Sequence, residues 1–162
     1  MPCIMGRMAE RCFSAQTVIG RPPSEVFAWI ADHRNVAKVL DGVRRWEPLG
    51  DPDRGLGARF AVAMQVLGLH LENVLVLDTW DEPRAIGWRS ESGLIGQSGG
   101  WRLEPDPGGT QVTLTIGYRP PGGALGGLVA GQVDAIVRGR LEAALDRMKD
   151  ILEASPPSAS AG

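Results

Sequence analysis

Cysteine and histidine are scarce in this chain, with two of each among 162 residues. Cys3 and Cys12 lie too close to the N-terminus to suggest a disulfide framework, and a metal site would need more ligands. Neither histidine belongs to a His-Glu-x-x-His motif, so the sequence predicts no metal site. The glycines at residues 55–57 lack the Lys-Ser/Thr of a phosphate-binding loop, and we expect no cofactor.

A strong charge of one sign and a long apolar run are also missing. Seventeen basic and nineteen acidic residues leave a formal charge of −2, which gives no general attraction to nucleic acid. No run of about twenty apolar residues exists, so we expect no membrane span. The first residues lack the apolar segment of a signal peptide, which favours a cytoplasmic location. Frequent Gly, Pro, Ala and Arg are typical of a bacterial source with a GC-rich genome.

The length of the chain is typical of one domain. We expect residues 1–8 to be a disordered N-terminal segment and residues 9–154 to form a single domain. The tail at 155–162 is small, polar and proline-rich, and we expect it to be disordered. There is no internal repeat.

Residues 121–154 have the clearest pattern, and they predict one long C-terminal helix. A helix of roughly thirty residues is about 45 Å long, so a broad surface must cover its apolar face. Asp134 and Arg138 are spaced to form an ion pair along the helix. The apolar residues recur every three to five positions: Leu125, Val129, Val133, Ile136, Leu141, Leu145, Met148 and Leu152.

Most of the preceding chain has the period-two alternation of half-buried antiparallel strands. A first strand at residues 10–20 is followed by two short helices, the second at residues 35–40. Five or six further strands precede the long helix, at residues 43–49, 58–67, 69–80, 85–91, 97–104 and 110–118. This order predicts an α+β fold in which a curved antiparallel sheet of six to seven strands wraps around the C-terminal helix.

Two short sequence segments occur within this order of elements. Residues 19–27 (IGRPPSEVF) lead a strand through proline into a Glu-Val-Phe helix start, and residues 77–84 (LDTWDEPR) end a strand in a Pro-Arg turn. Together they resemble the START-like (SRPBCC) superfamily, which includes polyketide cyclase/dehydrase-like proteins and the birch-pollen allergen. The resemblance covers roughly residues 10–153. It implies a helix-grip fold with a pocket for a hydrophobic ligand between the sheet and the C-terminal helix.

The strand alternation predicts which side chains line such a pocket. If Leu75 points at the helix, Asn73 does too, and a buried amide must find a partner. Trp88, Trp101 and Tyr118 are predicted to form an aromatic wall. A one-residue slip in register would place Arg89 and Arg102 inside instead. The expected ligand-binding residues are Phe27, Asn73, Leu75, Trp88, Ser90, Trp101, Leu114, Ile116, Tyr118, Leu125, Val129 and Val133.

Three functions remain open from the sequence. The first is binding or transport of a small hydrophobic molecule (a lipid, polyketide or aromatic) by a monomer or homodimer. The second, implied by the resemblance, is a polyketide cyclase/aromatase with His33, Tyr118, Asn73 and Ser90 as candidate groups. The third is a protein-interaction or regulatory module whose cavity is incidental.

His33 is more typical of a helix end than of an acid–base catalyst, and His70 shares an outward face with Glu72.

Overall fold

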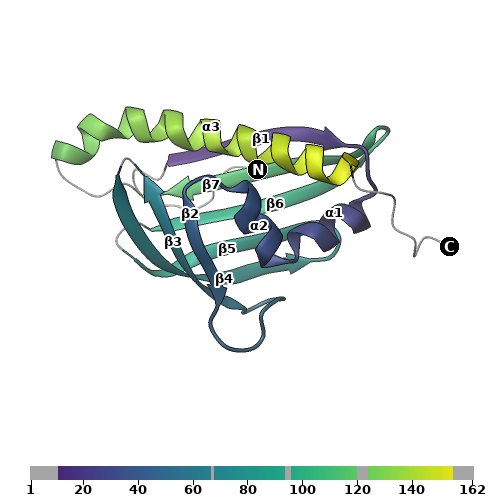
Figure 1. The fold of residues 1–162 in the computed structure, drawn as a ribbon, viewed down its shortest axis with the longest axis horizontal. Helices are drawn as coiled ribbons and strands as arrows, with labels where there is room; N and C mark the ends of the chain where they lie inside the picture. The colour runs from purple at the N-terminus through teal and green to yellow at the C-terminus, as the bar shows by residue number, and fades with distance from the viewer. Residues whose placement is uncertain (1–10, 67, 94–95, 120–123, 155–162) are drawn as a thin grey trace.

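The computed structural model describes residues 11–66, 68–93, 96–119 and 124–154, without the side chains of Val66, residues 124–131 and Val133. The long helix α3 crosses a curled sheet, and the short helices α1 and α2 lie beside it (Figure 1). The elements are β1 (Arg11–Ile19), α1 (Pro23–Ile30), α2 (His33–Val39), β2 (Val43–Pro48), β3 (Arg59–Val66), β4 (Leu69–Asp81), β5 (Ala85–Gly93), β6 (Gln97–Asp106), β7 (Gly109–Tyr118) and α3 (Ala124–Ala154).

All pairings in the described sheet are antiparallel, and its strands lie in the order β1-β7-β6-β5-β4-β3-β2. The chain therefore runs from β2 to β7 as a meander between neighbours, and β7 then pairs with the first strand. This confirms the α+β helix-grip fold, with seven strands. The two edges of the sheet are β1 and β2.

The register of β5 and β6 places the tryptophans inside the fold and the arginines outside. Trp88 and Trp101 are 4% and 2% exposed, whereas Arg89 and Arg102 are exposed. The alternation predicted for these strands is thereby confirmed. In β4 the pairing with β5 shifts between Leu77 and Thr79. Because of this irregularity, Trp80 faces inward and its ring meets that of Phe27 edge to face at 5.3 Å.

The C-terminal half of α3 is anchored by apolar packing. Five of its side chains are buried in the core, and the helix lies along β1 while also touching β7 and α2. Full burial of each large aliphatic side chain contributes about 1.5–3 kcal/mol, so this half holds the helix on the sheet. The five are Leu141, Ala144, Leu145, Met148 and Leu152.

Polar contacts fix the same half of α3 from both sides. The Arg147 guanidinium donates to both carboxylate oxygens of Asp41, at 2.8 and 2.9 Å, and to the Val39 carbonyl. On the β1 side, Lys149 donates to the carbonyl of Val18 at 2.6 Å. The Glu153 carboxylate accepts from the Gly20 N–H at 2.8 Å. Several residues distant in sequence thus hold the helix in one register.

Helix α2 begins at His33, two residues before the predicted start at residue 35. Asp32 is its N-cap, because its carboxylate accepts from the backbone N–H of Arg34 at 3.0 Å. The Arg34 side chain also donates to both Asp32 oxygens, and these bonds lower the pKa of Asp32 to about 2. The sequence prediction took residues 32–35 as a helix break and missed this cap.

Cys12, on β1, is disulfide-bonded, which the sequence analysis did not expect. In the described part of the chain, no helix is long and apolar enough to cross a membrane.

Replacing Trp101 tests the register directly. We expect Trp101→Ala to lower the free energy of unfolding by about 3–5 kcal/mol, because it leaves a large cavity in the core. Arg102→Ala is the matched control on the opposite face, and it should cost less than about 1 kcal/mol. Urea denaturation measures both. Equal costs for the two variants would contradict the register.

Candidate functional site

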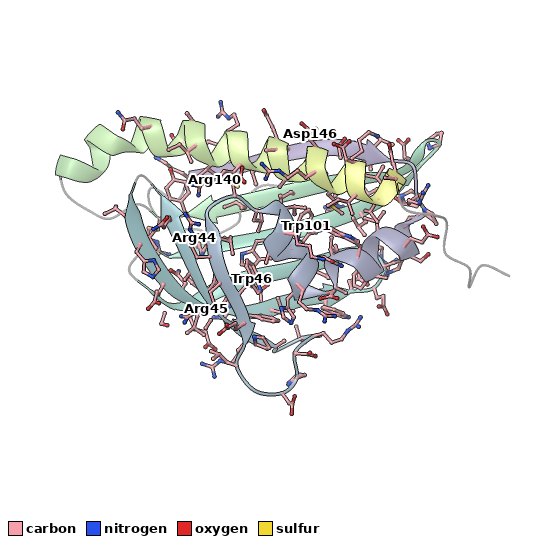
Figure 2. The ribbon with its side chains drawn as sticks, in the orientation of Figure 1. Arg44, Arg45, Trp46, Trp101, Arg140 and Asp146 are labelled. Atoms are coloured by element: carbon pink, nitrogen blue, oxygen red, sulfur yellow. The ribbon has the colours of Figure 1, made fainter. Side chains whose placement is uncertain are left out.

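An aromatic cluster lines the inner face of the sheet where β2, β3 and β5 face the interior. The Trp46 ring lies 6.2 Å from the Phe60 ring and 6.2 Å from the Trp88 ring, measured between centroids. His33, from α2, lies 5.3 Å from Phe60. We call these four residues the aromatic cluster. Figure 2 shows Trp46 over the interior of the sheet, while its neighbour Arg45 lies at the periphery.

Strand pairing explains how these side chains meet. Trp46 is opposite Val62, which is opposite Asn73, so the three share one row of the inner face. Trp88 is opposite Gly99 on β6, and a Cβ at Gly99 would lie only 2.4 Å from the indole ring. The indole therefore lies directly against the backbone of β6, which any larger residue at this position would prevent.

Two nitrogen atoms of the aromatic cluster are buried without a partner. Within the described part of the chain, His33 Nδ1 and Trp46 Nε1 have no hydrogen-bond partner. Buried polar groups are almost always bonded, because leaving one unbonded costs free energy. Among the described residues, the aromatic cluster is therefore where buried side-chain nitrogens lack a hydrogen-bond partner.

A second polar group connects α3 with the edge of the sheet. Tyr118, at the end of β7, donates its hydroxyl proton to Asp134 of α3. The other Asp134 oxygen accepts from Arg11 at 2.5 Å. The predicted ion pair of Asp134 with Arg138 is replaced by these contacts, since the Arg138 guanidinium lies over the Phe13 ring at 5.2 Å. Asp134 thus bridges α3 to β1 and β7.

Burial and the Asp134 carboxylate keep Tyr118 protonated. The side chain is 7% exposed, and desolvation is the largest cause that raises the pKa of Tyr118 above its ordinary value of 10.0. The hydrogen bond to Asp134 and the negative charge of Asp134 raise this pKa further. At neutral pH the phenol is a neutral group whose proton is directed to Asp134 and whose oxygen can still accept.

The predicted site residues fall into different environments. Phe27, Leu75, Trp88, Trp101, Leu114 and Tyr118 are buried apolar or aromatic side chains, and Asn73 is a buried amide. Ile116 and Ser90 are half-buried, and the Ser90 hydroxyl accepts from the Gln97 N–H at 3.0 Å. The side chains of Leu125, Val129 and Val133 lie outside the described residues.

The predicted aromatic wall differs from the observed arrangement. Trp88, Trp101 and Tyr118 all face inward, but the ring contact of Trp88 is with Trp46 and that of Tyr118 is with Phe13. The sequence prediction missed Trp46. A register shift between Val43 and Arg45 interrupts the alternation of β2, so a strict two-residue period gives no reliable face there.

A groove of about 400 Å³ lies on the outer face of the sheet, away from α3. Gly87 and Gly100 form its floor where β5 pairs with β6. Its charged side chains form ion pairs, Arg84 with Asp81, Arg102 with Glu104, and Asp78 with Arg89. We assign no function to the groove. No three His, Cys, Asp or Glu side chains of the described residues are grouped to hold a metal ion.

The family model for polyketide cyclase/dehydrase and lipid transport proteins matches residues 10–153. The chain belongs to this family. The resemblance to the START-like (SRPBCC) superfamily, first seen in the order of the elements, is confirmed. A comparison with curated protein sequences found no match.

Three solved structures illustrate the range of proteins with this fold. The protein TTHA0849 from Thermus thermophilus is 23% identical, with a TM-score of 0.75 over 91% of this chain and 99% of its own. The Zhui aromatase/cyclase from Streptomyces sp. R1128 is 25% identical, with a TM-score of 0.59 over 86% of each chain. Major latex-like protein 151 from Panax ginseng is 10% identical, with a TM-score of 0.63 over 88% and 97%.

The single tyrosine of the chain allows its titration to be followed without interference. The native state binds the phenolic proton more tightly than the unfolded state, so this stabilisation is fully present below pH 10 and is lost as the pH rises through the raised pKa. We expect the phenolate absorbance to appear only well above pH 10 in the native protein.

Asp134→Asn separates the causes of this shift. It should lower the pKa of Tyr118 towards 10.0 but leave it raised, because burial remains. Arg138→Gln, one turn further along α3, is the control and should leave the titration unchanged. A native tyrosine that titrates near pH 10 would contradict the described contact.

Proposed function

We propose that this protein binds a small hydrophobic molecule between the inner face of the sheet and α3, as a binding or transport protein. One observation carries the proposal. Ile116 faces inward from β7, which has paired strands on both sides, yet Ile116 is only half-buried. Leu114, two residues earlier on the same face, is 0% exposed. An inward side chain that keeps accessible surface indicates unfilled space beside it.

Other residues near Ile116 support the same conclusion. Phe13, its partner on β1, is also only partly buried, and so is Val137 of α3. Trp46 is partly buried although its ring packs on Phe60 and Trp88. By contrast, Leu141, Leu145 and Met148 in the C-terminal half of α3 are completely or almost completely buried. The proposed site is therefore apolar and aromatic, and it lies towards the N-terminal half of α3.

A cyclase/aromatase activity is the second candidate. The family description and the structural match to an aromatase/cyclase favour it. Tyr118 is the candidate that the contacts support best, because Asp134 holds the phenol neutral and oriented as a hydrogen-bonding group. A binding protein returns its ligand unchanged, whereas a cyclase converts a linear poly-β-keto chain with loss of water. Mass spectrometry of the recovered molecule distinguishes the two, and a stable protein partner with no bound molecule would favour a regulatory module.

Filling the space beside Ile116 tests the proposal. We expect Ile116→Trp to weaken binding of the neutral fluorescent apolar probe N-phenyl-1-naphthylamine at least tenfold, because the larger ring occupies the site. Thr115→Trp introduces the same ring on the outer face of the same strand and should leave the affinity unchanged. Fluorescence titration measures both.

Folding of each variant is checked by its thermal transition, and Val137→Phe fills the site from α3 if Ile116→Trp does not fold. Equal probe affinity of Ile116→Trp, Val137→Phe and the unaltered protein would refute the proposed site. Loss of binding in Thr115→Trp alone would move the site to the outer face.

A further inference from the structure

The two unpartnered nitrogens of the aromatic cluster give the proposed site a polar selectivity. We propose that Trp46 and His33 determine its ligand specificity by bonding a neutral carbonyl oxygen on a flat apolar ligand. This inference rests on the proposed function, because it assumes that a hydrophobic molecule occupies the inner face. The strand alternation assigned no role to Trp46, and His33 was considered only as a candidate group of a cyclase.

Trp46 sets the direction of the hydrogen bond. An indole N–H can only donate, so its partner must be an acceptor. His33 Nδ1 donates or accepts according to its tautomer and therefore can share the same oxygen or bind a neighbouring one. The Phe60 ring lies beside both the His33 ring and the Trp46 ring. The Trp88 ring packs edge to face against the Trp46 ring. The rest of a ligand at this place would meet aromatic faces, which favour a flat apolar body.

The surrounding charges favour a neutral acceptor over a carboxylate. A buried anion needs a cationic partner, and the nearest arginines on the same strand are turned away. Arg44 donates twice to the Gln65 side chain, at 2.8 and 3.2 Å, and Arg45 pairs with Glu72 at 3.2 Å. Both are exposed. A carbonyl oxygen satisfies the Trp46 N–H without bringing a charge into the aromatic cluster.

Both nitrogens are held in place by contacts outside the aromatic cluster. His33 is the first residue of α2, which the Asp32 cap fixes. The Asn35 side chain donates to the Trp29 carbonyl at 3.0 Å and thereby joins α2 to α1. Trp46 is held by the pairing of β2 with β3. Two polar atoms positioned in this way, and left without a partner, are a prepared recognition site.

A pair of probes that differ by one oxygen tests the inference. Acetylnaphthalene and ethylnaphthalene have nearly the same shape, but only the first carries a carbonyl group. We expect the unaltered protein to bind acetylnaphthalene about tenfold more tightly, which is the effect of one well-placed hydrogen bond. Isothermal titration calorimetry measures both affinities without relying on tryptophan fluorescence.

Trp46→Phe keeps an aromatic ring and removes the N–H, so the preference for acetylnaphthalene should fall to about twofold or less while ethylnaphthalene still binds. His33→Phe should reduce the preference in the same direction. Trp80→Phe is the matched control, because Trp80 contacts Phe27 and Arg54 outside the aromatic cluster. It should keep the preference.

The outcomes separate the two proposals. If both probes bind the unaltered protein equally, or if Trp80→Phe loses the preference as Trp46→Phe does, the specificity role of Trp46 and His33 is wrong while the binding site stands. If neither probe binds the unaltered protein, the proposed function fails, and this inference fails with it.

Discussion

The packing of the C-terminal half of α3 onto β1 is the contact on which the rest of the structure depends. Leu141, Leu145 and Met148 are completely or almost completely buried there, and Arg147, Lys149 and Glu153 fix the register of the helix. A straight helix cannot follow a curled sheet along its whole length. Away from this packed half, Ile116 on β7 and Val137 on α3 keep accessible surface. The proposed site lies beside these two residues.

Much of the fold could be predicted because its signals are local. The alternation of β5, β6 and β7 placed Trp88, Trp101 and Leu114 inside, and the spacing in α3 identified four of its buried residues, Leu141, Leu145, Met148 and Leu152. What could not be predicted depends on tertiary contacts. Nothing near Asp134 in sequence indicates that it binds Tyr118 and Arg11 in place of Arg138, because that choice requires β1 and β7 to lie beside α3.

Trp46 shows the second limit of sequence analysis. Its strand is an edge strand with an irregular register, so the period-two rule does not assign its face. Its partners come from β3 and β5, which are distant in sequence. The pattern of α2 likewise gave no reason to place the His33 ring against Phe60. Strand alternation misses residues whose contacts are distant in sequence. Here these include His33 and Trp46, whose buried nitrogens lack a partner and on which the proposed ligand contact rests.

The most direct test of this account locates a bound molecule by nitrogen–proton NMR. The five tryptophans give five indole N–H signals, which single Trp→Phe variants assign. On addition of acetylnaphthalene, we predict that the indole signals of Trp46 and Trp88 and the amide signal of Ile116 shift, while the amides of Thr79 and Gly100 in the outer groove stay unchanged. Shifts confined to Thr79 and Gly100, with the Trp46 and Trp88 signals unmoved, would contradict the account.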